Sequence, residues 1–153
     1  MSLHRAEDIA AAIKTRLLAR TVALGAETNL GRVVFQGRRH ISDDMIPCAT
    51  LIEGTDTPAQ GRLRTEYELA QHYVIFAYVP CDPANPNIAA HAAIRDIKRA
   101  LFTSAGKADA QMGGQVKLIE YAGRDIGPRA DGAAYVVAAV DVVVHYVEML
   151  NQP

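Results

Sequence analysis

Residues 66–79 read EYELAQHYVIFAYV, and this stretch decides the fold class. Its side chains follow the two-residue period of a strand, in which successive residues point to opposite faces of a sheet. One face is apolar nearly throughout, whereas the other changes from polar to apolar partway along. A strand over about 64–79 would be roughly 50 Å long, which is more than a compact domain of this size requires. We therefore expect its polar beginning to project from the body, as a hairpin with the preceding strand.

Two shorter runs upstream of this stretch also predict strands. Residues 32–35 are short and β-branched, and residues 45–53 form a second run with Pro47 near its start, where a missing donor costs least. Residues 54–61 contain two glycines, a proline and almost nothing to bury. We expect this segment to be a mobile loop.

Two amphipathic helices are expected around these strands. Apolar residues recur at helical spacing from Leu3 to about Leu24, and Gly25 provides the left-handed cap that ends a helix. A second helix is expected over 88–102, after a break rich in proline and asparagine. Its core stripe consists of Ala90, Ile94, Ile97 and Leu101. Its outer face carries His91, Arg95, Lys98 and Arg99.

The last third of the chain predicts a hairpin. Its strands are expected over 115–122 and 133–149, joined by a glycine-rich connector over 123–132, with another loop over 106–114 before it. In the final strand the even positions form one apolar row: Ala134, Val136, Ala138, Val140, Val142 and Val144.

The expected order is therefore helix, three strands, helix, two strands. This order predicts an α+β fold with an antiparallel or mixed sheet of about five strands and both helices packed on one face. At 153 residues the chain has the size of one domain, so we expect a single domain over 1–153.

Composition excludes several classes of function. The 16 basic and 17 acidic residues give a formal charge of -1, which disfavours binding to nucleic acid or to an anionic membrane. No apolar run reaches the roughly 18–20 residues that cross a bilayer, and charged residues stand where a signal peptide would be apolar. Two cysteines, Cys48 and Cys81, make no disulfide framework and suit a reducing cytoplasm.

The search for catalytic chemistry yields weak candidates only. His40 to Asp44 match no metal-ligand spacing, and Asp141 and His145 would lie roughly 13 Å apart along a strand, too far for a dyad. Neither cysteine stands in a Cys-x-x-Cys pair, so burial as small apolar side chains is the expected role of both. We expect no enzyme activity, no catalytic residue, no metal and no cofactor.

Several short motifs are more informative together than any one of them is alone. Each is a normal consequence of strand or helix composition, and their order and spacing carry the weight: Phe35-Gln36-Gly37-Arg38, Ile46-Pro47, Glu53-Gly54, Tyr78-Val79-Pro80, Ile94-Arg95-Asp96-Ile97 and Val140 to Tyr146. In this arrangement the chain resembles the tail terminator family, minor tail proteins of long-tailed bacteriophages and their prophages.

The resemblance implies a structural protein of virion assembly. Such a protein is made in the host cytoplasm and becomes part of the virion tail. It forms a ring of six copies on the end of the tail tube, ends polymerisation of the tube, and presents a surface to the head completion protein. The implied partners are thus further copies of the chain, the tail tube protein and the head completion protein, without nucleic acid, membrane or cofactor. The isolated chain is expected to be largely monomeric.

Charged residues of both signs provide candidates for the subunit or tube interface. Neighbouring copies in a ring would pair them, and the loops over 54–62 and 123–132 would become ordered on contact. The candidates are Arg62, Arg64, Glu66, Glu68, Arg124, Asp125, Arg129 and Asp131.

Two alternatives remain open at this point. A head-tail connector or tail completion protein shares the size and the expected fold and differs in the partner that it meets. A small-molecule enzyme or ligand-binding domain would instead use the open face of the sheet. Neighbouring genes for tail tube, tape-measure or portal proteins would favour the virion role, whereas a metabolic operon would favour the enzyme.

Overall fold

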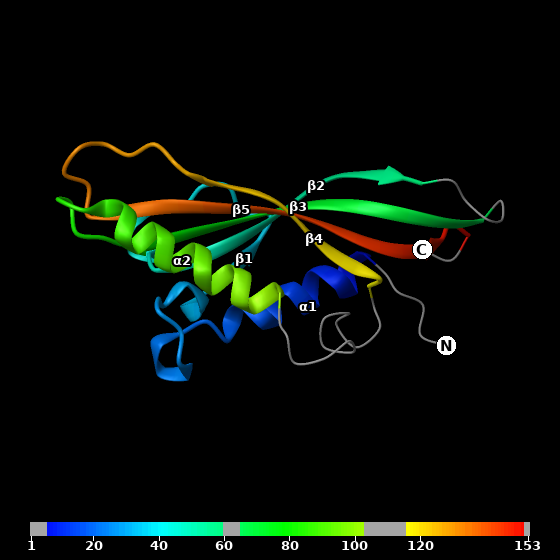
Figure 1. The fold of residues 1–153 in the computed structure, drawn as a ribbon, viewed down its shortest axis with the longest axis horizontal. Coiled ribbons are helices and arrows are strands. Elements are labelled where there is room, and N and C mark those ends of the chain that lie inside the picture. The colour runs from blue at the N-terminus through cyan, green and yellow to red at the C-terminus, as the bar shows by residue number, and fades with distance from the viewer. Residues whose placement is uncertain (1–5, 60–64, 103–115, 152–153) are drawn as a thin grey trace.

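A five-stranded mixed sheet carries two helices on one face in the computed structural model, which describes residues 6–59, 65–102 and 116–151 (Figure 1). The predicted α+β class and the predicted order of elements are confirmed. Short 3-10 turns lie at Val22–Leu24, Leu30–Arg32 and Asp43–Met45. The helices and strands are α1 (Ala6–Leu18), β1 (Val34–Gln36), β2 (Cys48–Pro58), β3 (Glu66–Pro80), α2 (Pro86–Leu101), β4 (Leu118–Ile126) and β5 (Tyr135–Met149).

The strand order in the sheet is β1-β2-β3-β5-β4. β1 runs parallel to β2, and the other neighbouring pairs are antiparallel, so the sheet is mixed. β3 and β5 pair along their whole length, from Glu66 opposite Met149 to Pro80 opposite Tyr135. This long central pair is the frame on which the rest of the chain is arranged.

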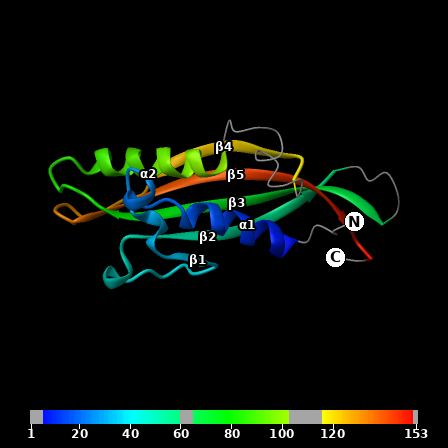
Figure 2. The ribbon, with the colours of Figure 1, turned by 90° about the horizontal axis from the view of Figure 1, so that it is seen from below.

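Both helices lie on the same side of the sheet and run along its strands (Figure 2). α1 packs on β1 and β2, whereas α2 packs on β5, β3 and β4. Pro86 occupies the first turn of α2, where its missing N–H removes no helical hydrogen bond. The apolar stripes of the helices are buried, as predicted: Ile9, Ala10, Ile13 and Leu17 on α1, and Ala90, Ile94, Ile97 and Leu101 on α2.

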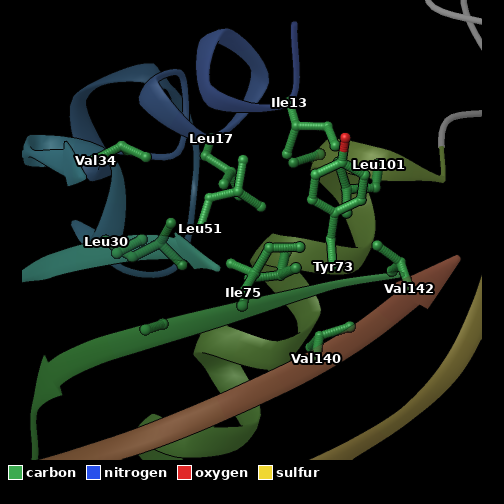
Figure 3. Packing of buried hydrophobic residues seen from close by; sticks show 14 of the residues in the cluster. Ile13, Leu17, Leu30, Val34, Leu51, Tyr73, Ile75, Leu101, Val140 and Val142 are labelled. Carbon is green, nitrogen blue, oxygen red and sulfur yellow. The ribbon is translucent and has the colours of Figure 1, made fainter. Parts of the chain in front are cut away.

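The core lies between this helix layer and one face of the sheet (Figure 3). Tyr73 and Ile75 of β3 point toward the helices and are fully buried, beside Val140 and Val142 of β5. The predicted apolar row of the last strand is buried from Val136 to Val144, but Ala134 is exposed because β5 begins one residue later.

The segment between α1 and β1 is fixed on the body by one buried carboxylate. Asp96 of α2 is fully buried and accepts hydrogen bonds from the Glu27 and Thr28 amides, at 3.1 and 2.7 Å, and from the Thr28 hydroxyl at 2.7 Å. Gly31, three residues after Thr28, lies tightly against the backbone of Arg20. A Cβ at position 31 would lie 2.8 Å from the Arg20 carbonyl oxygen. Because backbone atoms cannot give way as a side chain can, this approach requires glycine.

The predicted extent of the first helix is wrong at its C-terminal end. The helix stops at Leu18, and Leu24 is 71% exposed instead of lying in the core. Gly25 does adopt a left-handed conformation, with φ 94°, but it ends the 3-10 turn that precedes it. The contacts with Asp96 take this segment away from the helix axis, so tertiary packing overrides the helical periodicity. Residues 3–5 of the predicted helix lie outside the described residues.

Two predicted loops are strands for part of their length. β2 continues to Pro58 after a bulge between Glu53 and Asp56, and its last residues pair with β3 from Gln71 to Leu69. The long β3 offers its backbone groups to this segment, and that pairing outweighs the loop-like composition. Residues 60 and 61 of this predicted loop, and all of the predicted loop over 106–114, lie outside the described residues.

The same correction applies to the predicted connector over 123–132. Its residues up to Ile126 belong to β4 and pair with β5. A bulge between Tyr121 and Gly123 precedes them, and Gly123 adopts φ 124°, a conformation that favours glycine. The glycine therefore marks an irregularity within the strand and not its end.

Candidate assembly surfaces

The ends of three strands project beyond the helices and form what we call the arm. It comprises the described residues 53–59, 65–71 and 146–151 of β2, β3 and β5 and their flanks. Its far part extends past both helices (Figure 1), whereas its base adjoins the core, where Glu53 lies opposite Tyr73 and both Leu69 and Tyr146 are buried. The expectation that the polar beginning of the long strand projects is met, with β5 as a third strand beside the expected hairpin.

The described part of the arm is acidic. It carries five carboxylates and neither lysine nor arginine. From the strand register, Glu53, Asp56 and Glu148 lie on the helix side of the sheet, whereas Glu66 and Glu68 lie on the other side. The Tyr146 hydroxyl stands near the first three, and burial, followed by the charges of Glu148, Asp56 and Glu53, raises its pKa to about 12.

The face of the sheet opposite the helices is a second surface, which we call the open face. Its centre is formed by alternate residues of β3 and β5, each partly exposed to solvent. Apolar side chains dominate this centre: Val74, Phe76, Tyr78, Val137, Ala139 and Val143. Neither described helix covers it (Figure 1). An apolar sheet face of this kind is a candidate for contact with another chain.

The chain between β1 and β2 covers the part of this face next to β1. Cys48 and Thr50 lie opposite Tyr78 and Phe76, and so on the same face, yet both are buried. The Thr50 hydroxyl donates a hydrogen bond to the Arg38 carbonyl at 2.7 Å. The exposed part of the open face is therefore limited to the region of β3 and β5.

A basic surface lies on the outer side of α2 and on β4, and we call it the basic face. It consists of His91, Arg95, Lys98, Arg99 and Arg124. Both arginines of α2 contact Glu27, with the Arg95 Nε at 2.8 Å and the Arg99 Nη1 at 2.9 Å from its Oε2. Hydrogen bonding from Arg95 is the chief cause of the lowered pKa of Glu27.

Aromatic side chains lie beside these cations. The Lys98 ammonium is 4.6 Å from the centre of the Tyr121 ring, and Phe102 meets that ring edge to face at 6.3 Å. Phe102 is 36% and Tyr121 44% exposed. Exposed aromatic rings on a surface that also carries arginines have the composition of a protein interface.

The structure separates the eight residues predicted for the interface into distinct regions. Arg62 and Arg64 lie outside the described residues. Glu66 and Glu68 are on the arm, and the Glu68 Oε2 lies 3.3 Å from the Lys117 ammonium of the same chain. The remaining four, on β4 and on its connection to β5, are Arg124, Asp125, Arg129 and Asp131.

Of these four, two use their charge within the chain. Arg124 Nη1 lies 3.0 Å from the His91 Nδ1, and the Arg129 guanidinium donates to the Ala133 carbonyl. Asp125 and Asp131 are exposed. The two predicted groups are not brought together: Glu68 lies opposite Val147 and Asp125 opposite Ala139, eight residues apart along β5, or roughly 26 Å.

The residues considered for catalysis are scattered. Cys48 is buried, and this burial raises the pKa of its thiol, so it is not an activated nucleophile. Asp141 and His145 share the open face, but His145 pairs with Glu120 of β4, Nε2 to Oε2, at 3.0 Å. His40 and Asp44 are both exposed, and Asp44 belongs to the 3-10 turn Asp43–Met45. In the described part of the chain, no three histidine, cysteine or carboxylate side chains are grouped to hold a metal ion.

One apolar pocket lies at the end of the molecule away from the arm. Its volume is about 460 Å³, and its lining includes Val22, Pro47, Cys81 and Ile88. Ile88 is 70% and Val22 56% exposed at its rim.

Sequence reasoning missed how the acidic and basic surfaces are composed. Glu53, Asp56 and Glu148 join Glu66 and Glu68 only through strand pairing, and Arg124 reaches the α2 cations because β4 packs beside that helix. The signals available in the sequence were the change from polar to apolar along residues 66–79 and the outer face of the expected second helix, which carries four of the five residues of the basic face.

Comparison with protein families and with curated proteins finds no match for this chain. Among the described helices, none has the length and apolar character needed to span a membrane.

Proposed function

We propose that this chain is a tail terminator of a long-tailed bacteriophage or prophage. Six copies form a ring on the end of the tail tube, end its polymerisation and join the tail to the head through the head completion protein. The role is structural and requires no turnover and no cofactor.

The observation that carries the proposal is the arm that projects beyond the helix layer while the sheet keeps an open face (Figure 1). A ring needs contacts between two unlike surfaces of each copy, since a surface that meets only itself produces a dimer. The arm, the open face and the basic face supply such unlike surfaces on one chain. A further surface then remains for the tube or for the head.

The order and spacing of the motifs support the same role. The arrangement that resembles tail terminators comprises the N-terminal helix, a short strand, a second strand begun by Ile46-Pro47, a long strand and a second helix. The elements occur in this order in the structure, and the second strand begins at Cys48, directly after Ile46-Pro47.

Assembly of tails with and without this chain tests the proposal. Tails made without it are expected to have tubes of varied length that fail to join heads, and electron microscopy measures both properties. Addition of the purified chain is expected to restore a uniform length and to place a ring on the tube end. Tubes of uniform length that join heads normally in its absence would overturn the proposal.

The same experiment separates the terminator from a head-tail connector. Loss of the chain would leave tube length uniform if the protein only connected head and tail, and only the joining step would fail. Length control is therefore the deciding measurement, and head joining is the accompanying one.

A further inference from the structure

We infer that the acidic arm of one copy docks on the basic face of a second copy of this chain. The inference rests on the proposed ring and names the contact that builds it. Its occupant is a second copy because the two surfaces have opposite charge and lie apart on one chain.

The charge of the arm is negative even when nearby basic residues are counted. The described residues carry Glu53, Asp56, Glu66, Glu68 and Glu148, and the Lys117 ammonium lies 3.3 Å from Glu68 Oε2. With Lys117, and with Arg62 and Arg64 of the intervening sequence, five negative and three positive side chains give a net charge of -2 over residues 53–71, 117 and 146–151.

The basic face has the opposite charge. Arg95, Lys98, Arg99 and Arg124 contribute four positive charges, and Glu27 contributes one negative charge, so the net charge is +3 with His91 neutral. Asp96 does not reduce it at the surface, because its carboxylate is buried and bonded to residues 27 and 28. The side chains of Arg95 and Arg99 remain 48% and 57% exposed despite their contacts with Glu27.

The far part of the arm lies well away from the basic face on one chain. Glu66 lies opposite Met149 on β5, whereas Arg124 lies opposite Val140. Nine residues of β5 separate these positions, roughly 30 Å along a strand. This is about three times the screening length of about 8–10 Å at moderate salt, so charges at this end of the arm act on a partner and not on the basic face of the same chain.

Apolar groups accompany the charges on both surfaces. Tyr121 and Phe102 are exposed at the basic face, at 44% and 36%. On the arm, Leu150 is 49% exposed and Met149 is partly exposed. Charge steers two such surfaces together, and burial of apolar and aromatic groups then holds them.

The contact is head to tail, since each copy offers its arm in one direction and its basic face in another. Contacts of this type close into a ring when the rotation between copies permits it. One contact repeated around the ring uses both surfaces of every copy and leaves the open face free.

Charge reversal in the full-length chain tests this contact. The arm variant carries Asp56→Lys and Glu66→Lys, and the face variant carries Lys98→Glu and Arg124→Glu. Self-association is measured by sedimentation as a function of concentration, and rings are counted on tube ends by electron microscopy. Each variant alone is expected to associate at least tenfold more weakly than the wild type, because its arm and its face now repel.

An equal mixture of the two variants provides the decisive measurement. Reversed arms then meet reversed faces and native arms meet native faces, so alternating copies close a ring of six. Association of the mixture is expected to return to within about tenfold of the wild type. A mixture that stays as weak as its components would overturn the contact.

A matched control distinguishes an effect of the total charge on association from an effect of where the charges lie. The variant Asp43→Lys with Asp44→Lys changes the total charge by the same amount as the arm variant, at exposed positions away from both surfaces. It is expected to associate as the wild type does, and its failure to do so would overturn the contact. Thermal unfolding of every variant checks that each is folded.

The failure of this contact and the failure of the proposed function give different results. Rings of wild-type chain on tube ends that also form with either reversal variant would overturn the contact and leave the ring standing. Wild-type copies that associate and respond to charge reversal as expected, but never cap tubes, would support the contact and overturn the tail function.

Discussion

The two halves of the long central strands have the same backbone pairing and different surroundings. Where β3 and β5 run beneath the helices, Ile75 and Val140 are fully buried. In the arm the same strands pair with equal regularity and extend past both helices (Figure 2). On the helix side of the sheet, burial continues as far as Leu69 and Tyr146, and Glu148 beyond them is partly exposed. Strand pairing alone therefore does not bury a surface, and the uncovered half is the one left for a partner.

The largest expected effect on stability comes from removing the buried carboxylate of Asp96. Asp96→Ala removes the acceptor of three hydrogen bonds, from two amides and one hydroxyl of residues 27 and 28. We expect the free energy of unfolding to fall by about 3 kcal/mol, because these donors are then left unpaired. Chemical denaturation measures the change.

The exposed Asp125 provides the control for this change. Asp125→Ala is expected to alter stability by no more than about 0.5 kcal/mol, as is usual for surface substitutions. Equal effects of the two substitutions would show that Asp96 does not fix the 27–28 segment on α2.

A pair of valines on β5 compares the covered side of the sheet with the arm. Val142 is fully buried under the helices, whereas Val147 is partly exposed in the arm, on the other side of the sheet. Val142→Ala is expected to cost about 2 kcal/mol of stability, through lost burial and a small cavity, and Val147→Ala less than about 0.5 kcal/mol. Denaturation of both variants under one set of conditions measures the difference, and similar costs would mean that Val147 is packed as closely as Val142.

Hydrogen exchange gives a finer comparison without any mutation. Amides of the strand residues 66–68 are expected to open at a free energy at least about 1 kcal/mol below those of 140–144, because the side chains of 66–68 are only partly buried. The predicted loop over 54–62 was expected to exchange fast throughout. The strand pairing of its residues 54–58 now implies protection that is intermediate and not absent. Protection of the arm equal to that of 140–144 would contradict this gradient.

Much of the fold followed from side-chain periodicity, and the exceptions have physical causes. The stripe from Ile9 to Leu17 and the row from Val136 to Val144 were predicted because burial repeats along an element. The end of α1 and the course of β2 beyond Glu53 depend instead on Asp96 and on the length of β3. No local signal in the sequence reports a partner that lies tens of residues away.

The candidate surfaces were less accessible to sequence reasoning than the fold. Glu66 and Glu68 were selected from the polar start of one strand, and the structure places both on the arm. Arg129 and Asp131 were grouped with Arg124 by proximity in sequence, although the chain turns away from the basic face after β4. Charges gathered from several strands and a helix become visible as one surface only when the register is known.

The smallest expected effect on stability concerns the exposed ion pairs of Glu27. Glu27 contacts Arg95 and Arg99, and hydrogen bonding from Arg95 is the largest cause that lowers its pKa below the ordinary value of 4.5. A carboxylate with a lowered folded pKa contributes stability that is fully present above pH 4.5, and that contribution is lost as the pH falls through the folded value. The melting temperature of Glu27→Gln is therefore expected to lie slightly below that of the wild type at pH 7, and the gap is expected to close as the pH falls below 4.5. Since the pair is exposed, high salt should narrow the gap at pH 7 as well. A gap that persists unchanged from pH 7 to pH 3 would show that Glu27 acts through packing and not through its charge.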